Sequence, residues 1–200
     1  AQVGKLITVS ASYTDGIGAK EAVTSGATAV VVVPGTVVTA AQMTDSALNT
    51  ILFQARADDT VTLPPGKYTF NGPLTLTTDN VSIVGAGNGT YAAQNTILSF
   101  KGAASRNGVV VRNVKKVTLK GFGVEDAEGN GIFVESSTDV VMDTVRTEWT
   151  NDPVGTSLMA YGLYPVGCDN VLVVNSKAIG TRDAGVYVGQ STNIRVIGNE

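Results

Sequence analysis

The chain has 200 residues and a formal net charge of −3; only 16% of its residues are charged, and Val, Thr and Gly are abundant. This length is ample for one core, and the composition favours stacked strands with tight bends over helices or disorder. The lack of a basic stripe argues against nucleic acid as the main partner, and the absence of histidine excludes histidine-based zinc sites, nucleophile pairs and general bases.

Residues 1–43 are predicted to form a β-rich segment. Lys5–Tyr13 alternates in polarity like a strand, and Ala27–Val33 is a β-branched run. The segment is too apolar for a disordered tail, so we expect it to pack on the rest of the chain or on a neighbouring subunit. Its longest apolar run, Ala29–Pro34, is too short to span a bilayer. A start at Ala1-Gln2 without a charged leader fits a mature exported protein.

A helix is predicted over residues 45–56. Thr44 or Asp45 can cap its N-terminus, and apolar residues recur at helical spacing at Leu48, Ile51, Leu52 and Ala55. The helix leads into the string DTVTLPPGKYTF at 59–70, and together they resemble the N-terminal cap of pectate-lyase-like β-helix proteins. Such a helix would cover the apolar end of the first coil.

One pattern then recurs, in which a glycine is followed by an alternating apolar run. The glycines are Gly108, Gly131, Gly162 and Gly185, at spacings of 23, 31 and 23 residues, so one unit carries eight inserted residues. Self-similarity at a fixed period indicates a solenoid. We therefore predict an all-β parallel β-helix over 44–200, with three strands and about 23 residues per coil, continuing beyond 200.

Strand alternation assigns the inward residues of each coil. Those of the first strands are Val109/Val111, Ile132/Val134, Leu163/Pro165 and Val186/Val188; those of the second are Val117/Leu119, Val140/Met142, Val171/Val173 and Ile194/Val196; those of the third are Phe122/Val124, Val145/Thr147 and Ser176/Ala178. Asn170 and Asn193 are expected to stack at a bend. The outward face of the second strands carries Val141, Leu172, Val174 and Ile197, and we expect residues 1–40 or another subunit to cover it.

The resemblance covers about residues 45–200 and is sharpest at Arg146–Thr150, Tyr161–Val166 and Ala178–Ser191. These segments look like a bacterial secreted group of right-handed parallel β-helix repeat proteins within the pectate-lyase-like superfamily. The superfamily implies polysaccharide lyases, glycoside hydrolases, epimerases and non-catalytic surface proteins. The group implies an extracellular or cell-surface location, with the periplasm as the alternative, more strongly than it implies any one reaction.

Four charged residues on the outward face of the third strands are catalytic candidates: Glu125, Glu148, Arg146 and Lys177. In-register stacking would place the two carboxylates one strand spacing apart and raise the pKa of one of them, as in a retaining glycosidase. In a lyase, Arg146 would neutralise a uronate, and Lys177 or Tyr164 would take the proton. The alternative is a charge lattice that keeps the strand face soluble.

Six further residues are substrate-binding candidates: Phe133, Trp149, Tyr161, Tyr164, Asp183 and Tyr187. Phe133, Tyr164 and Tyr187 would stack as an outward row, which suits sugar rings or a protein interface. Trp149 and Tyr161 flank the insertion, which we place at 150–160, where it would overhang the row. The alternatives are that the insertion covers the row, that Trp149 anchors the insertion, and that Asp183 is a turn residue.

We therefore expect a secreted or cell-surface protein that binds or processes a polysaccharide or cell-surface glycan. The alternative is a structural protein that assembles into filaments through an open coil end, the Val141/Leu172/Val174/Ile197 face or residues 1–40. No cofactor is expected, and calcium at Asp183 or Glu125 is the one metal left open. The lone Cys168 cannot form an internal disulfide, and we expect it to be a small buried residue rather than a nucleophile.

Overall fold

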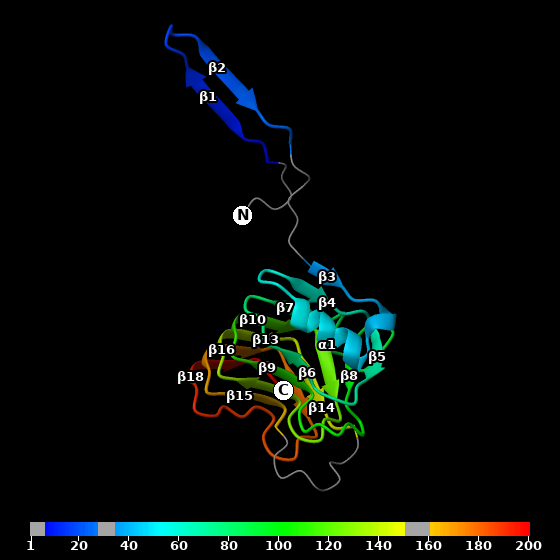
Figure 1. Ribbon diagram of the computed structural model, residues 1–200. Coiled ribbons are helices and arrows are strands. Elements are labelled where there is room, and N and C mark those ends of the chain that lie inside the picture. Colours follow the sequence, from blue (N-terminus) through cyan, green and yellow to red (C-terminus); the bar gives the residue numbers. More distant parts are fainter. Residues whose placement is uncertain (1–6, 28–34, 151–160) are drawn as a thin grey trace. The chain divides into compact units, whose positions relative to one another are not determined.

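The structure, a computed structural model, describes residues 7–27, 35–150 and 161–200. The chain divides into two compact units, Ala1–Pro34 and Gly35–Glu200. Residues 35–43, which the sequence assigned to the N-terminal segment, belong to the second unit. There β3 (Gly35–Val37) pairs in parallel with β4 (Thr60–Thr62), while Val38 and Met43 are buried in the core (Figure 1).

The first unit is a β-hairpin. Strands β1 (Ser10–Thr14) and β2 (Lys20–Thr24) are antiparallel, and the Asp15 carboxylate accepts hydrogen bonds from two backbone N–H groups of the turn. The predicted strand Lys5–Tyr13 overlaps β1, whereas most of the predicted run Ala27–Val33 lies outside the described residues. The prediction that residues 1–40 cover the second-strand face stays a prediction for residues 1–34.

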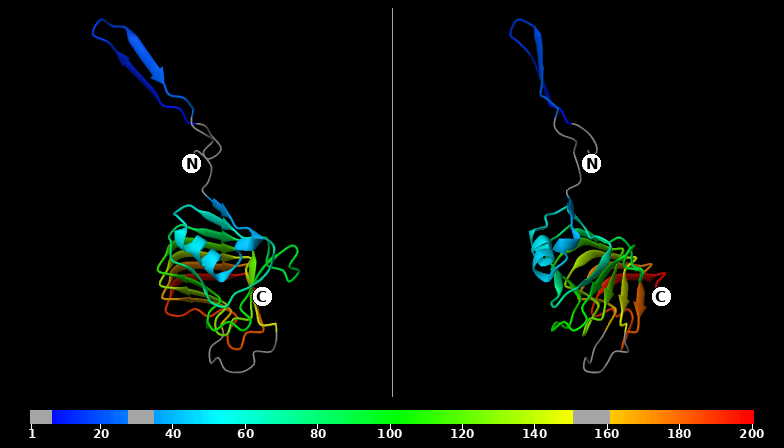
Figure 2. Two further views of the ribbon diagram at one scale, coloured as in Figure 1. Left: turned by 45° about the vertical axis from the view of Figure 1, so that its right-hand side comes forward. Right: turned by 90° about the vertical axis from the view of Figure 1, so that its right-hand side faces the viewer.

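The second unit is a parallel β-helix in which the chain visits three sheets in a fixed order (Figures 1 and 2). The second-strand sheet contains β3, β4, β7 (Ser82–Val84), β10 (Lys115–Lys120), β13 (Thr138–Asp143), β16 (Asp169–Val174) and β18 (Thr192–Ile197). The third-strand sheet contains β5 (Gly66–Thr69), β8 (Thr96–Ser99), β11 (Phe122–Glu125), β14 (Arg146–Glu148) and β17 (Lys177–Ile179). The first-strand sheet contains β6 (Leu74–Leu76), β9 (Val109–Arg112), β12 (Ile132–Glu135) and β15 (Leu163–Val166), and parallel bridges at Val186 and Gly189 extend it.

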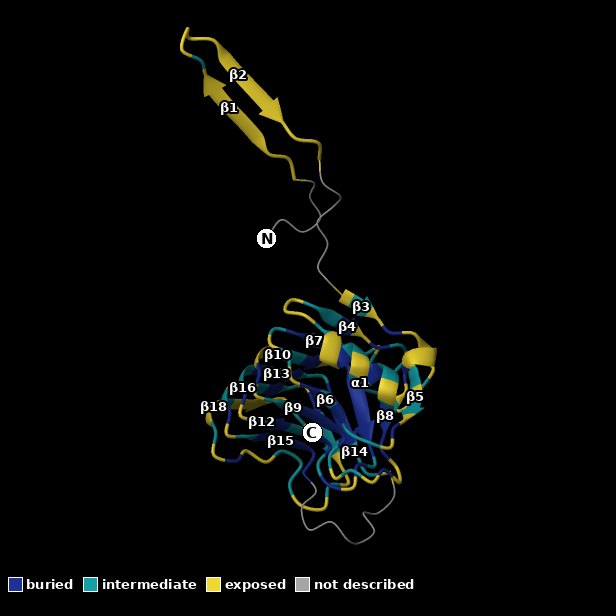
Figure 3. Ribbon diagram, viewed as in Figure 1, coloured by how far each residue is buried: buried dark blue, intermediate teal, exposed yellow. Residues whose placement is uncertain are grey.

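The predicted register is confirmed. Val117, Val140, Val171 and Ile194 are successive partners in the second-strand sheet, and Val109, Ile132 and Leu163 are partners in the first-strand sheet. Their side chains point inward, and the inward side chains of β9 to β16 are buried, whereas most outward residues of these strands are less buried, so the strands carry both dark blue and teal in Figure 3. Each repeat therefore makes one coil, and equivalent residues lie one strand spacing apart, about 4.8 Å.

The repeated glycines are required by space rather than by backbone conformation. A Cβ at Gly131 would lie 2.6 Å from Thr147 Cγ2, and one at Gly162 would lie 2.4 Å from the Gly185 carbonyl oxygen and 2.6 Å from Thr147 Oγ1. Neither glycine has a positive φ. The glycine thus lets the start of each first strand approach the third-strand side chains, which closes the coil.

The bends of the coils use residues that tolerate the left-handed region. Lys116, Asp139, Asn170 and Asn193 occupy the same bend on successive coils, with φ of 58°, 58°, 54° and 55°. Asn and Asp adopt this conformation more readily than most residues because their short side chains can bond locally. The amides bond to carboxylates of the preceding coil, Asn170 to Asp139 at 2.6 Å and Asn193 to Asp169 at 2.7 Å, so the ladder joins amide to acid.

The predicted helix is α1 (Asp45–Gln54), which follows a short 3₁₀ turn (Ala40–Gln42). Thr44 caps it by accepting a hydrogen bond from the Ala47 N–H, and the Asn49 side chain bonds to the backbone of Pro73 and Thr75 at the start of the first-strand sheet. In chain order α1 stands between β3 and β4, so it occupies the first coil in place of third and first strands.

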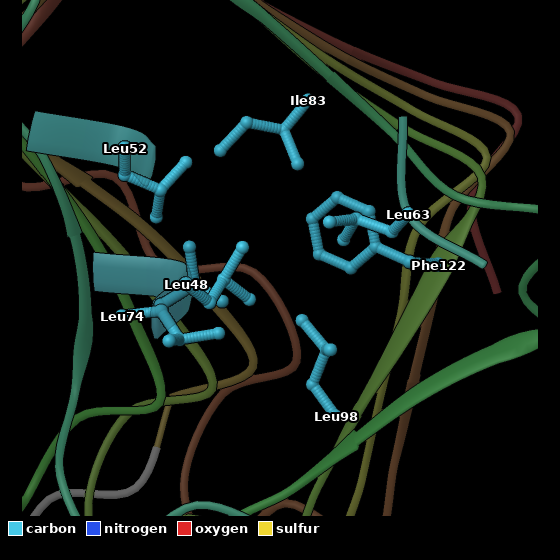
Figure 4. Close-up of a pocket in the computed structure, with 8 residues that line it drawn as sticks. Leu48, Leu52, Leu63, Leu74, Ile83, Leu98 and Phe122 are labelled. Atoms are coloured by element: carbon cyan, nitrogen blue, oxygen red, sulfur yellow. The ribbon is translucent and has the colours of Figure 1, made fainter. Parts of the chain in front are cut away.

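Helix α1 covers the interior of the solenoid at this end. Its Leu48 and Leu52 point at leucine, isoleucine and phenylalanine side chains from the first full coils (Figure 4). An entirely apolar cavity of about 10 Å³ lies between them, lined by Leu48, Leu52, Leu63, Leu74, Ile83, Leu98, Val109 and Phe122. A space of this size holds at most one water-sized sphere, and its apolar lining offers water no partner. The cavity is therefore a packing gap under the cap.

Candidate functional site

Three of the four predicted charged residues, Glu125, Arg146 and Glu148, meet on the outward face of β11 and β14. Glu125 and Glu148 are directly paired in register, and Arg146 is paired with Gly123 on one side and Lys177 on the other. The predicted stacking of the two carboxylates is confirmed. What the sequence did not predict is their burial, since Glu125 is 3% exposed and Arg146 is 2% exposed.

The Arg146 guanidinium lies between the two carboxylates and binds both. Its Nη2 donates to Glu125 Oε1 at 2.7 Å, and its Nη1 donates to Glu148 Oε2. Its Nε donates to the Asn88 carbonyl oxygen at 2.7 Å, which ties the 85–95 loop to the sheet. A Cβ at Gly123 would lie 2.8 Å from Arg146 Nη2, so the absence of a side chain there makes room for the guanidinium.

The remaining oxygen of Glu125 is also occupied, because Lys67 Nζ lies 2.7 Å from Glu125 Oε2. Burial by itself raises the pKa of Glu125, but hydrogen bonds from Lys67 and Arg146 outweigh it and hold the pKa below its ordinary value. This direction is opposite to the one expected from two stacked carboxylates. A general acid needs a raised pKa, so the arrangement favours a structural ion cluster.

Lys177 lies outside this cluster although it is the register partner of Arg146. It forms an exposed ion pair with Glu200, with Nζ and Oε2 2.6 Å apart. A catalytic role of Glu125, Glu148, Arg146 and Lys177 stays a prediction. The contacts of the first three are those of a clamp between two coils and the 85–95 loop.

Acid should weaken this clamp in a defined way. Because the pKa of Glu125 is lower in the folded protein than its ordinary value of 4.5, the stabilisation is fully present above that value and is lost as the pH falls through the folded pKa. We expect the free energy of unfolding, measured in urea at a series of pH values, to fall below about pH 4.5. The Glu125→Gln variant should show a shallower fall over the same range, and an identical slope in the two proteins would contradict the assignment.

Aromatic side chains form a second cluster, on the outward face of the first-strand sheet. Phe133 and Tyr164 are register partners whose ring centroids lie 5.3 Å apart, and Tyr164 and Tyr187 are also 5.3 Å apart. The predicted aromatic row is confirmed. Tyr161 joins it by stacking on Tyr187 at 4.4 Å, with an interplanar angle of 15°, and by an edge contact with Tyr164 at 4.9 Å. We call Phe133, Tyr161, Tyr164 and Tyr187 the aromatic face.

The four rings differ in what they can offer to a ligand. Tyr161 is 8% exposed, because its ring is stacked on Tyr187, whereas Tyr187 is 39% exposed. Tyr164 leans over Gly189, where a Cβ would lie 3.2 Å from its Cε2. Tyr161 is therefore the buried member of the face, and Tyr187 is the most exposed of the four residues.

Two carboxylates flank the aromatic face. The pKa of Tyr161 is raised by burial and then by the Asp183 charge. The pKa of Tyr164 is raised by burial, then by Tyr187, and then by the Glu135 charge. Glu135 was not among the predicted site residues. The signal was present in the alternation of β12, which puts Glu135 on the same face as Phe133.

The insertion is held at both ends by the preceding coil. Trp149 Nε1 donates to the Ala127 carbonyl oxygen at 2.6 Å, Thr150 bonds to Asp126, and the Tyr161 N–H donates to Asn130 Oδ1 at 3.2 Å. These contacts favour the anchoring role for Trp149. Residues 151–160 of the predicted insertion lie outside the described residues, as does any cover that they provide.

Cys168 occupies a column of small polar residues, between Ser137 and Ser191, at one bend. Its thiol is buried and donates to the Val166 carbonyl oxygen at 3.3 Å, and burial raises its pKa. A thiol that is buried and harder to ionise is a poor nucleophile. The structure thus places Cys168 as a packing residue, as the sequence predicted.

No group of three His, Cys, Asp or Glu side chains that could hold a metal ion occurs in the described parts of the chain. Calcium at Asp183 or Glu125 stays a prediction. Within the same residues, no helix has both the length and the apolar character needed to cross a membrane.

Comparison with known proteins addresses the fold. A family model described as a right-handed beta helix region matches residues 78–200. A solved structure of a "putative glycosyl hydrolase" from Parabacteroides merdae is similar, with a TM-score of 0.53, 12% sequence identity and coverage of 72% of each chain. At this identity the likeness concerns the fold alone. A search among curated proteins found no match.

Proposed function

The chain belongs to the right-handed β-helix family, and from this premise we propose that it binds polysaccharide, outside the cell or at the cell surface, through the aromatic face. Sugar rings have apolar faces and polar edges, and tyrosine has an apolar ring with a polar tip, so the two surfaces match. The structural neighbour described as a glycosyl hydrolase has the same fold, and this supports a carbohydrate ligand.

One observation carries the proposal: the aromatic row is continuous over three coils and is partly open to solvent. Centroid distances of 5.3 Å join Phe133 to Tyr164 and Tyr164 to Tyr187, and Tyr187 is 39% exposed. Contiguous exposed aromatics mark interaction sites more often than chance surface residues do. A glycan chain that runs along the solenoid axis would meet one ring per coil.

Binding is favoured over processing because the catalytic candidates Glu125, Arg146 and Glu148 are held in ion pairs with one another and with Lys67. Both oxygens of Glu125 are engaged by Lys67 and Arg146, and Arg146 also engages Glu148. A hydrolase needs one carboxyl to donate a proton and another to attack or activate water, and residues fixed in this clamp are poorly placed for either task. The proposed function therefore includes no catalytic step.

The test replaces the most exposed ring. Tyr187→Ala removes the outermost surface of the aromatic face, and we expect roughly a tenfold loss of affinity for any glycan that the parent protein binds, a loss typical of an aromatic anchor. Tyr91→Ala, in the 85–95 loop and 66% exposed, is the matched control and should leave binding unchanged. A glycan-array screen of the parent identifies the ligand, and calorimetry measures the variants. Equal affinities of the parent and Tyr187→Ala would contradict the proposal.

A further inference from the structure

The aromatic face has an acidic residue at each end along the strand direction. All first strands run parallel, so their N-terminal ends share one edge of the sheet. Asp183 lies at that edge, exposed, in the bend that precedes the bridge at Val186, and its charge acts on Tyr161. Glu135 lies at the opposite edge, where β12 ends, in register with Val166 of β15. A ligand that lies on the rings therefore has a carboxylate on either side.

The basic residue of the first-strand sheet itself, Arg112, lies one coil farther from the open rings than Glu135, and Arg182 precedes Asp183 in the same exposed bend. Arg112 is the register partner of Glu135, but on the preceding coil. The Glu135 coil therefore separates Arg112 from Tyr164 and from Tyr187, the most exposed ring. The electrostatic influences on the phenols agree with this placement, because the charged groups that act on the pKa values of Tyr161 and Tyr164 are Asp183 and Glu135.

Aromatic faces attract cations through the negative potential above the ring, and the attraction grows when the cation is partly desolvated. Carboxylates beside the rings add to that potential, since an opposite charge within a few ångströms is favourable at a partly buried site. An anionic sugar would instead approach two like charges. A neutral sugar would gain the ring contact alone.

Resting on the proposed polysaccharide binding, we propose that the aromatic face prefers glycans with free amino groups, the protonated amine lying against Tyr164 and Tyr187 between Glu135 and Asp183. The ligand class is thus an amino-sugar polymer whose nitrogen is not acylated. Glu135 and Asp183 act as specificity residues: they select the charge, while the rings supply contact with the sugar.

The experiment compares two ligands that differ in the acylation of one nitrogen per sugar, and therefore in its charge. Oligomers of glucosamine and of N-acetylglucosamine of equal length are titrated into the full chain by calorimetry at low salt and mildly acidic pH, where the sugar amines are protonated and carboxylates are still ionised. We expect about tenfold tighter binding of the glucosamine oligomer. Glu135→Gln and Asp183→Asn should each reduce that ratio severalfold, and added salt should reduce the ratio in the parent.

The control variant is Asp79→Asn, which removes a negative charge from a bend while its side-chain oxygen can still accept from the Lys115 N–H. It should leave the ratio unchanged. Equal binding of the two oligomers, or tighter binding of the acetylated one, overturns the preference for amines and leaves glycan binding in place. Binding of neither oligomer nor of any array glycan overturns glycan binding itself.

Discussion

Arg146→Met is expected to lower the free energy of unfolding by about 3–5 kcal/mol, the range found when one partner of a buried ion pair is removed. The variant leaves the Glu125 carboxylate, whose side chain is 4% exposed, with Lys67 as its remaining partner, and it leaves the Asn88 carbonyl oxygen without its donor. Methionine fills much of the space but cannot donate a hydrogen bond. Urea denaturation followed by circular dichroism measures the change.

Lys177→Met is the matched control. Lys177 is the register partner of Arg146, carries the same charge and receives the same replacement, but its ion pair with Glu200 is exposed to solvent. Exposed pairs contribute about 0–1 kcal/mol, so this variant should remain close to the parent. Similar losses in the two variants would mean that burial of Arg146 is not what matters.

The double variant Arg146→Met with Glu125→Met separates two causes of lost stability: the buried Glu125 charge that loses its Arg146 partner, and the altered packing at position 146. If the cost of Arg146→Met comes from an uncompensated buried charge, removal of that charge should restore part of the stability, because apolar replacements of a buried pair are often well tolerated. A double-mutant cycle gives the coupling energy. A double variant that is less stable than either single variant would contradict the explanation.

The coil register could be predicted from the sequence because each repeat has the same residue types at the same positions. Gly108, Gly131, Gly162 and Gly185 mark one position on successive coils, and the alternation after each of them assigns inward and outward faces. Once the register is known, the stacking of Glu125 on Glu148 and of Phe133 on Tyr164 follows. These were the strongest predictions, and they are confirmed.

The burial and the ion-pair partners of Glu125 and Arg146 could not be predicted in the same way. Lys67 reaches Glu125 from two coils away, and the 85–95 loop, predicted from sequence only as a glycine-rich turn, supplies the carbonyl groups that bind Arg146. A repeat pattern shows which residues share a column but not which irregular loop covers it. The sequence predicted a raised pKa for one of the two stacked carboxylates, and it gave no sign that these contacts lower the pKa of Glu125.

Two smaller differences also have a local cause. The helix ends at Gln54 rather than at residue 56, because Ala55 already has an extended ψ of 145°. Glu135 was not among the predicted site residues, although the alternation of β12 places it on the same face as Phe133. The repeat alone could not reveal that the Asp183 charge acts on Tyr161, since both residues lie outside the strands.

The cap should be the second large determinant of stability. Leu48→Ala is expected to cost about 2–5 kcal/mol, because Leu48 is 1% exposed and truncation would enlarge a cavity that already lies beside it. Phe53→Ala on the same helix is the control, since Phe53 is 77% exposed; its effect should stay within about 0.5 kcal/mol, as for most surface substitutions. Urea denaturation of both variants provides the comparison.

Leu48→Ala should also show which coils of the solenoid lose stability first. In a stack of repeats each coil is stabilised mainly by its neighbours, so Leu48→Ala should first weaken the coils next to α1. Hydrogen exchange should quicken in β4, β6 and β7 before it changes in β13 and β16, which lie farther along the stack. Uniformly faster exchange over the whole second unit would mean that it unfolds as one block, and that the cap acts on the entire solenoid rather than on its first coils.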